Sequence, residues 1–435
     1  MEIDKLQMKD SGLSWIEEIP HTWETARVKY LFSSSKGLPI TKENLIENGL
    51  SVISYGQIHA KSNNGVSITQ DLLRFVDFSY QLLYPKSQVF NGGFVFADTS
   101  EDLDGCGNCV YKRDDNLLFA GYHSIVLISK ATTDNRFLAY LFKTDAWRKQ
   151  IRELVSGVKV FSISQRALLN ASIILPPADE QKRIAYFLDK ECEKIDWLKT
   201  DIQLQIDTLE QYKRSVITEA VTHGLNHNAP VKDSGVDYID EIKADWKISK
   251  IGFVCTKLTR GFSEDDPALI CSNKGNVVFR DEQHACGKMV SEDNAMQGIH
   301  IGDIAIHGMD TWHGAIGFSN IRGKITRVVH VCDSTEDKRF IVYYLKSLAY
   351  QGVYKLISNG IRGNTSDFRS WDKVKDIYIC LPSIVEEEKQ ICDYLDSVIE
   401  SVDKIIVGKK AQLDMLDEYK KSLIYEYVTG KKVMR

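Results

Sequence analysis

Residues 175–224 read LPPADEQKRIAYFLDKECEKIDWLKTDIQLQIDTLEQYKRSVITEAVTHG. Two prolines end any preceding strand, and Asp179 and Glu180 then supply the negative charge that the first turn of a helix favours. Apolar residues recur at spacings of three and four up to Gly224, a residue type common just after a helix C-terminus. About 45 residues at 1.5 Å each give a rod of roughly 65 Å with one narrow apolar seam, which is typical of a coiled-coil helix.

The same pattern occurs a second time further along the chain. Residues 381–430 read LPSIVEEEKQICDYLDSVIESVDKIIVGKKAQLDMLDEYKKSLIYEYVTG, and a shift of 207 positions aligns Ile184 with Ile391. A further repeat opens each half, because the KDSG of residues 9–12 recurs 223 positions later at residues 232–235. The chain is therefore a tandem duplication of a globular part followed by a rod.

The repeat predicts the fold class. We expect an α+β chain in which two similar, β-rich mixed α/β domains are separated by two long helices; the helices pair as an antiparallel coiled coil, and the repeat gives pseudo-twofold symmetry. The predicted boundaries are a first domain at residues 1–174, a first helix at 175–226, a second domain at 227–380 and a second helix at 381–435. The seam between the helices is predicted to contain Ile184, Leu188, Ile195, Ile202, Ile206, Leu209, Ile391, Leu395, Val402, Leu413, Leu416 and Leu423.

Composition is that of an ordinary water-soluble protein with two globular domains. Of 435 residues, 43% are hydrophobic and 26% are charged. No run of 18 apolar residues suggests a membrane span, and nine cysteines without regular spacing favour reduced thiols in a cytoplasm. The formal net charge of −5 argues against a solitary nucleic-acid binder and suits a protein that shares DNA with basic partners.

Two stretches join a strand to residue types that read DNA bases. Residues 52–59 (VISYGQIH) indicate a strand that runs into a polar loop, and residues 301–317 indicate a strand that delivers two histidines and Thr311. A Gly-rich turn at residues 359–365 adds one cation, which suits a phosphate contact. Solvated hairpin loops have a similar composition, so these stretches alone leave both interpretations open. Residues 136–154 show the spacing of a helix.

The sequence gives little support for catalysis. Cys106 and Cys109 form a C-x-x-C pair, but no second pair completes a zinc site. Glu180 and Lys182 superficially resemble part of a nuclease motif, yet they open a rod, where acidic residues favour the helix start. No nucleotide-binding loop, adenosyl-cofactor turn or nucleophile elbow is present. We therefore expect no catalytic residue and no metal site in this chain.

The two rods resemble the spacer helices of specificity subunits from type I restriction–modification systems. The segments FADTS (residues 96–100), AGYH (residues 120–123) and GMDTWHGAIG (residues 308–317) are similar to stretches of that family's target recognition domains. The second rod departs from the family pattern: Lys409, beside Gly408, stands where the first rod has Ile202, and Glu388 replaces the family's Gln181. We expect a locally weaker seam there.

The resemblance implies a subunit that recognises double-stranded DNA. Each domain would read one half of a split, non-palindromic target, and the helices would set the unread gap and dock two modification subunits. Restriction subunits, which are motor nucleases, would join through these. Adenosylmethionine, ATP and Mg²⁺ would be bound by the partner subunits, and this chain would bind no cofactor. The resemblance also implies a protein of the bacterial or archaeal cytoplasm that does not act at a membrane.

We expect bases to be contacted by loop residues at strand ends. The candidates in the first domain are Tyr55, Gln57, His59, Lys112, Arg113, His123 and Lys159. The candidates in the second domain are Asn273, Lys274, His307, Thr311, His313, Arg322, Arg362 and Asn364.

One alternative belongs to a different class of function. A self-paired coiled coil could present two protein-binding domains as a scaffold without DNA, and the acidic charge balance favours it. Salt-dependent DNA binding separates the two interpretations.

Overall fold

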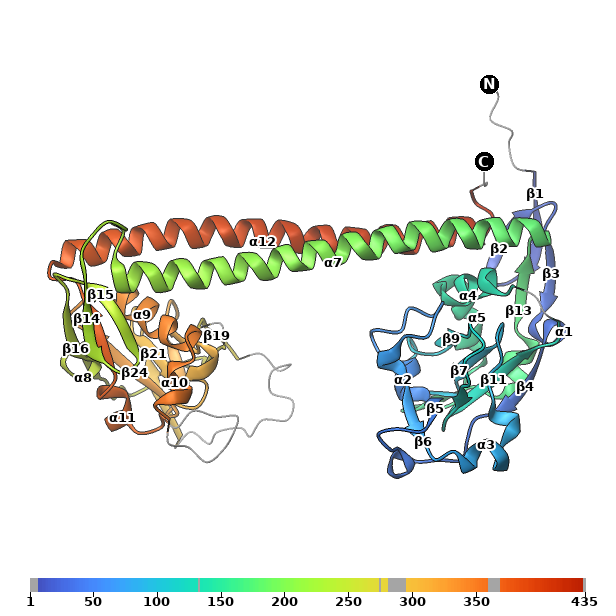
Figure 1. The fold of residues 1–435 in the computed structure, drawn as a ribbon, viewed down its shortest axis with the longest axis horizontal. Coiled ribbons are helices and arrows are strands. Elements are labelled where there is room, and N and C mark those ends of the chain that lie inside the picture. Colours follow the sequence, from blue (N-terminus) through green and yellow to red (C-terminus); the bar gives the residue numbers. More distant parts are fainter. Residues whose placement is uncertain (1–6, 132–133, 274, 281–294, 359–367, 433–435) are drawn as a thin grey trace, which may run out of the picture. The chain divides into compact units, whose positions relative to one another are not determined.

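The computed structural model describes residues 7–131, 134–273, 275–280, 295–358 and 368–432. Its contacts divide the chain into two units: unit 1 contains residues 1–201 and 412–435, and unit 2 contains residues 202–411. Each unit holds one β-rich domain and half of each of two long helices, α7 (Ala178–His223) and α12 (Val385–Val428) (Figure 1). The predicted fold class is confirmed.

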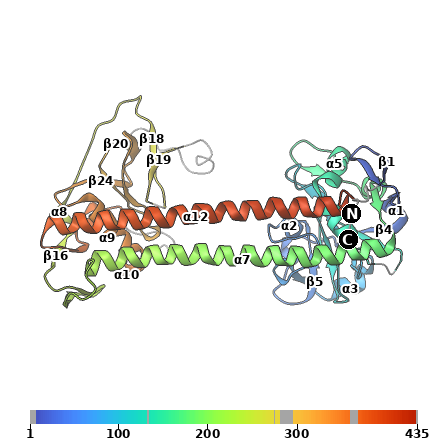
Figure 2. The same cartoon turned by 90° about the horizontal axis from the view of Figure 1, so that it is seen from above.

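The two helices lie side by side and antiparallel within each unit (Figure 2). The contacts pair an early residue of one helix with a late residue of the other: Phe187 with Tyr427 and Asp196 with Lys420 in unit 1, and Gln205 with Lys409 and Lys213 with Asp403 in unit 2. This order of partners is what an antiparallel coiled coil requires.

The predicted seam is buried between the helices and against the domains. Eight of its members are at most 5% exposed: Ile184, Leu188, Ile195, Ile206, Ile391, Leu395, Val402 and Leu423. The other four, Ile202, Leu209, Leu413 and Leu416, are half-buried. At the position of Ile202, the second helix carries Lys409, whose ammonium group donates to Gln205, so a polar contact replaces an apolar one there.

The unit 1 domain is built on a four-stranded sheet in the order β4-β11-β7-β9. These strands are β4 (Phe32–Lys36), β11 (Ser124–Ser129), β7 (Phe94–Ala97) and β9 (Cys109–Tyr111). A three-stranded sheet contains β10 (Phe119–Ala120), β5 (Leu50–Ile53) and β6 (Arg74–Val76). The two-stranded pairs are β1 (Met8–Leu13) with β2 (Ile16–Pro20), β3 (Glu24–Arg27) with β13 (Ser172–Leu175), and β8 (Thr99–Ser100) with β12 (Phe161–Ser162).

Strand β7 is buried on both faces, and its alternating side chains join two cores. Phe94 and Phe96 belong to the core that extends to the long helices, whereas Val95 and Ala97 belong to a smaller core on the other face. Helices α4 (Arg136–Lys143) and α5 (Asp145–Leu154) lie between this sheet and α7 (Figure 1). The remaining helices are α1 (Val28–Leu31), α2 (Tyr55–Ile58), α3 (Ser79–Leu83) and α6 (Gln165–Asn170).

The helix predicted over residues 136–154 is interrupted. Thr144 has extended backbone angles (φ −70°, ψ 142°), and its hydroxyl oxygen accepts a hydrogen bond from the backbone N–H of Trp147. A threonine at this position acts as an N-cap, so it ends α4 and starts α5. Periodicity alone missed the break because the apolar spacing continues across it.

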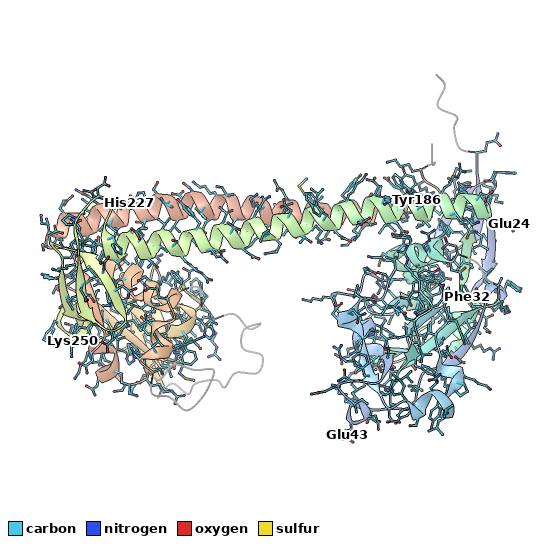
Figure 3. All side chains as sticks on the ribbon, in the orientation of Figure 1. Glu24, Phe32, Glu43, Tyr186, His227 and Lys250 are labelled. Carbon is cyan, nitrogen blue, oxygen red and sulfur yellow. The ribbon has the colours of Figure 1, made fainter. Side chains whose placement is uncertain are left out.

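The unit 2 domain repeats the four-stranded sheet in the equivalent order β17-β24-β21-β22. These strands are β17 (Cys255–Lys257), β24 (Val329–Ser334), β21 (Ile304–His307) and β22 (Ile316–Phe318). A second sheet contains β19 (Val277–Phe279), β18 (Ala268–Cys271), β23 (Gly323–Thr326) and β20 (Met296–Ile299). β14 (Val231–Val236) pairs with β15 (Ile239–Lys243), and β16 (Lys247–Lys250), whose Lys250 is labelled in Figure 3, pairs with β25 (Tyr378–Leu381). The helices are α8 (Ile251–Val254), α9 (Lys338–Tyr350), α10 (Val353–Leu356) and α11 (Trp371–Lys375).

An aspartate on a long helix fastens each domain to the rod. In unit 1, Asp189 of α7 accepts from Arg136 (2.8 Å), Arg113 (2.9 Å) and the hydroxyl of Tyr140 (2.9 Å). In unit 2, Asp396 of α12 accepts from Arg339 (2.8 Å) and the hydroxyl of Tyr343 (2.5 Å). We name these two sets of residues the unit-1 latch and the unit-2 latch. Asp189 and Asp396 are related by the 207-residue repeat.

Candidate nucleic-acid interface

Four rings form a cluster at one edge of the unit 1 domain. Tyr55 lies 5.5 Å from Tyr122, 5.5 Å from His123 and 6.2 Å from His59 between ring centroids. We name Tyr55, His59, Tyr122 and His123 the unit-1 cluster. It brings together three of the residues predicted to read bases.

Strand ends bring these rings together. β5 and β10 are parallel neighbours, so their carboxyl ends deliver Tyr55 and Tyr122 to the same edge of the sheet. A β-carbon at Gly121, just before Tyr122, would lie 3.0 Å from Cβ of Ser54 and 3.1 Å from Cγ2 of Val52, so this close approach favours glycine. β7 and β11 are antiparallel, and Asp98 after β7 therefore faces His123 before β11.

The segment that follows β5 is a short helix and not the predicted polar loop. Ser54 is the N-cap of α2, and its backbone N–H donates to the side-chain oxygen of Gln57 at 3.2 Å, as in a capping box. Gln57 is thus engaged in its own helix start. Sequence reasoning missed α2 because it spans one turn only.

His123 has an unusual backbone conformation. Its φ of +51° lies in the left-handed region, which costs a residue with a β-carbon roughly 1–2 kcal/mol. Its Nδ1 lies 3.4 Å from the carboxylate of Asp98 and 3.4 Å from the hydroxyl of Thr99, and 58% of the side chain is exposed. Backbone strain of this kind concentrates where a side chain is held for a ligand.

His59 is held by hydrogen bonds on both ring nitrogens. Nε2 lies 2.8 Å from the carbonyl oxygen of Thr99, and Nδ1 lies 3.0 Å from the amide nitrogen of Asn108. These two contacts engage both nitrogen atoms of the ring. In this structure His59 therefore positions the cluster, and its ring atoms are already engaged.

The three predicted cations of unit 1 differ in their surroundings. Lys112 is only 3% exposed and pairs with Asp114, so the structure argues against a base contact by this side chain. Arg113 belongs to the unit-1 latch, where Asp189 engages its guanidinium group. Lys159 is exposed in the segment between α5 and β12.

The equivalent edge of unit 2 carries a different set of side chains. β21 occupies the place of β7 in its sheet and ends at His307, whose Nδ1 accepts from the backbone N–H of Asp310 at 3.0 Å. This contact folds the loop into one 3₁₀ turn (Thr311–His313). His313 is exposed, and the ammonium group of Lys355 lies 5.6 Å from the ring centre of Trp312. We name His307, Trp312, His313 and Lys355 the unit-2 cluster.

The other residues predicted to contact bases in unit 2 differ in their exposure. Thr311 is only 1% exposed, so the structure argues against base contact by its side chain, which is enclosed by the domain. Asn273 is exposed in the turn between β18 and β19, and Arg322 is 61% exposed while pairing with Asp266 at 3.3 Å. Lys274, Arg362 and Asn364 lie outside the described residues.

Sequence reasoning did not select Tyr122, Trp312 or Lys355. A usable signal was present for the first two, since each aromatic residue directly precedes a histidine at a strand-connecting loop. Lys355 comes from α10, well beyond the loop in sequence, and only the fold places it on Trp312.

Within the described ranges, no group of His, Cys, Asp and Glu side chains could hold a metal ion. Cys106 and Cys109 are both buried, and burial raises the pKa of Cys109 to about 12, so it is a packed thiol at neutral pH. Of the helices in that same part of the chain, none is long and apolar enough to cross a membrane.

Comparison with known proteins finds similarity to one family of DNA-recognising subunits. A family model for the type I restriction modification DNA specificity domain matches residues 20–208. The chain is 23% identical over 437 residues to the putative type I restriction enzyme MjaX specificity subunit of Methanocaldococcus jannaschii, with 96% of this chain and 95% of that protein covered. The MjaVIII specificity subunit of the same organism is 24% identical over 323 residues, which cover 68% of this chain and 70% of that protein.

The chain is similar to the specificity subunits of type I restriction–modification systems. A chain solved in a study of complex assembly and conformational transition of the type I R-M system has the same fold, with a TM-score of 0.67 at 15% identity. That match covers 95% of this chain and 99% of the solved one. The matching family model describes a DNA specificity domain, and the two clusters are the candidate DNA-contacting sites of this chain.

Proposed function

We propose that the chain reads a bipartite, asymmetric DNA target, with one half-site contacted by each unit. The carrying observation is that two topologically equivalent sheets end in clusters of different chemistry: tyrosines and histidines in the unit-1 cluster, and histidines, a tryptophan and a lysine in the unit-2 cluster. Clusters of different side chains recognise different bases, so the two half-sites should differ. This makes the target non-palindromic.

The test is adenine-methylation mapping of a host that carries the chain and its modification subunit, compared with a host in which the chain is deleted. A split, asymmetric methylated motif that disappears on deletion is the expected result. Exchange of His123 and Tyr122 for alanine should then relax one half of that motif and leave the other half intact. If methylation is retained and neither half of the motif changes, the unit-1 cluster does not contact the DNA bases.

We also propose that the helices set the gap between the half-sites. The latches support this, because each fixes its domain to a long helix through a carboxylate that accepts two or more hydrogen bonds. A helix has a fixed rise of about 1.5 Å per residue, so its length is a measure of distance.

The exposed apolar side chains of the helices are the proposed docking surface for the modification subunits. In unit 1, Tyr186 (labelled in Figure 3) is 61% exposed and Trp197 is 66% exposed; in unit 2, Val407 is 67% exposed. Tyr186 and Trp197 lie about three helical turns apart on one face of α7, and contiguous exposed apolar surface marks contact sites. Trp197→Ser should reduce co-purification with the modification subunit without shifting the thermal unfolding midpoint; full recovery of the complex would contradict this assignment.

On this proposal the chain performs no chemistry. Adenosylmethionine is brought by the modification subunits, and ATP and Mg²⁺ by the restriction subunits that join through them. Shared contact with DNA by these partners accounts for a recognition subunit with a net charge of −5.

A further inference from the structure

Unit 1 contains a cavity of about 840 Å³ between its domain and α12. Residues 63–65 and 107–109 form one wall, the junction of α4 and α5 forms a second, and Glu418 to Tyr425 of α12 form the third. The cavity adjoins the unit-1 cluster, because Asn108 in its wall hydrogen-bonds to His59.

Four cations line this cavity. Arg148 donates to the carbonyl oxygens of Cys106 (3.1 Å) and Asp104, and Lys421 pairs with Glu418 at 2.7 Å. Lys143 and Lys149 form no ion pair with a carboxylate in the part of the chain that the structure describes. The cavity therefore presents positive charge that its own walls do not neutralise.

Lys143 is the more constrained of these two lysines. Its stem passes Gly65, whose β-carbon, if present, would lie 3.8 Å from Cδ. The nearby ammonium groups of Lys199 and Lys420 are held by Asp417 and Asp196, respectively. Burial, together with the charge of Lys420, lowers the pKa of Lys143 to about 8. An ammonium group withdrawn from water without a counter-ion is destabilising, and an anion in the cavity would offset that cost.

Part of this arrangement recurs in unit 2: the lysine, a neighbouring glycine and an ion pair. Lys346 of α9 takes the place of Lys143, burial lowers its pKa, and it too forms no ion pair among the described residues. Gly275, in a left-handed conformation (φ +75°) like Gly65 (φ +77°), lies against its ammonium end, since a β-carbon there would lie 2.7 Å from Nζ. The neighbouring ion pair of Lys213 with Asp403 corresponds to that of Lys420 with Asp196 under the 207-residue shift. A chance packing defect would not be expected in both copies.

We infer that the unit 1 cavity is a phosphate-binding site in which Lys143, with Lys149 at its edge, holds a backbone phosphate of DNA beside the half-site that unit 1 reads. The inference rests on the proposed function. DNA lying on the unit-1 cluster passes the cavity wall at Asn108, and lysine is a usual phosphate partner that fixes register without reading sequence. Lys346 holds the corresponding phosphate in unit 2.

The test measures the affinity of the full chain, assembled with its modification subunits, for duplex DNA that contains the target, at salt concentrations from about 50 to 200 mM. For Lys143→Met, the slope of log K against log salt should become shallower by about 0.9, the value for one lost phosphate contact. For the double variant Lys143→Met/Lys346→Met, the slope should become shallower by about twice that amount. The base preference of both variants should be unchanged. Lys143→Arg, which retains the charge, should restore the slope.

Lys29→Met is the matched control. Lys29 lies on α1, on the opposite side of the domain from α2 (Figure 1), and bonds to Asn170 at 3.1 Å. This variant loses the same charge and should retain the wild-type slope. Methionine at position 143 removes an uncompensated charge and keeps the chain length, so Lys143→Met should fold; a circular dichroism melt checks this.

Three outcomes overturn the inference. The first is an unchanged slope for Lys143→Met while the wild type binds its target, which leaves the proposed function intact. The second is competition with DNA by inorganic phosphate or ATP at micromolar concentration that is lost in Lys143→Met, which assigns the cavity to a free phosphate. The third is that Lys143→Met no longer assembles with the modification subunits while the salt slope is unchanged. That result would mean that the cavity binds a carboxylate of a partner subunit. Failure of the wild type to bind any target would instead refute the proposed function.

Discussion

Glu388 illustrates how one substitution between the repeats changes the chemistry of a buried position. In the first repeat, Gln181 donates its amide to the carbonyl oxygen of Pro176 at 2.8 Å. In the second repeat, Glu388 is 1% exposed, and one of its oxygens accepts from the backbone N–H of Asp337 at 2.9 Å. Its other oxygen has no hydrogen-bond partner among the described residues. Burial raises the pKa of Glu388 to about 7.

We predict that Glu388→Gln stabilises unit 2 in a pH-dependent manner. Between the unfolded pKa of 4.5 and the folded pKa of about 7, the folded state binds more protons, so the wild type loses stability as pH rises through this range. At pH 8 the variant should gain on the order of 2 kcal/mol, and near pH 4.5 the gain should vanish. Chemical unfolding at both pH values measures the difference.

The control for this prediction is Glu386→Gln, an exposed neighbour in the same helical turn with the same change of charge. At pH 8 this control variant should be slightly less stable to unfolding than the wild type, because an acidic residue near a helix N-terminus is favourable. An equal gain for Glu388→Gln at both pH values would mean that packing, and not ionisation, governs the position.

The two latches differ in how many carboxylates they contain on the long helix. Arg339 of the unit-2 latch also bonds to Asp393 at 2.8 Å, whereas the position 207 residues before Asp393 is Tyr186. The unit-1 latch therefore depends on Asp189 as its one helix carboxylate among the contacts described, and the unit-2 latch has a second.

We predict that Asp189→Asn loosens its domain more than Asp396→Asn does. The first change removes the helix carboxylate that serves two arginines and should cost unit 1 about 1–3 kcal/mol; the second leaves Arg339 paired with Asp393 and should cost less. Hydrogen exchange of α4 and α9 reports each unit separately. Equal acceleration in both helices would show that Asp393 does not substitute for Asp396.

For the whole molecule, the proposed spacing role of the helices predicts that lengthening both helices lengthens the unread gap of the DNA target by a defined number of base pairs. Insertion of seven residues in both helices, after Gln205 and after Gly408, retains the coiled-coil phase and lengthens each helix by about 10 Å. At about 3.4 Å per base pair, the unread gap should grow by about three base pairs while both half-sites stay the same. Methylation mapping measures the gap.

Insertion in one helix alone is the control, since it shifts one side of the seam against the other and should abolish methylation. An unchanged gap after the double insertion would contradict a spacing role for the helices.

The long helices could be predicted from the sequence because their signal is periodic and local. Ile184 and Leu188 recur in phase, and the prolines and glycines mark both ends, so the sequence of one helix is enough to predict its seam. The surroundings of the candidate DNA-reading residues depend on contacts distant in sequence. The sequence suggests that Lys112 is exposed to solvent, but it is buried and pairs with Asp114. Arg113 forms an ion pair with Asp189 of the long helix α7. Thr144 interrupts a helix through one side-chain hydrogen bond that apolar spacing does not register.

The division of the chain into units has a consequence for its synthesis. The core of unit 1 includes Leu423, Ile424, Tyr427 and Val428, which leave the ribosome after all of unit 2. At about 5–20 residues per second, translation from Asp201 to Gln412 takes roughly 10–40 s. During that interval Ile184 and Leu188 lack part of their packing, while unit 2, a continuous stretch, can close first. The domain that is translated first is thus completed last, and a polypeptide cut short before α12 never completes it.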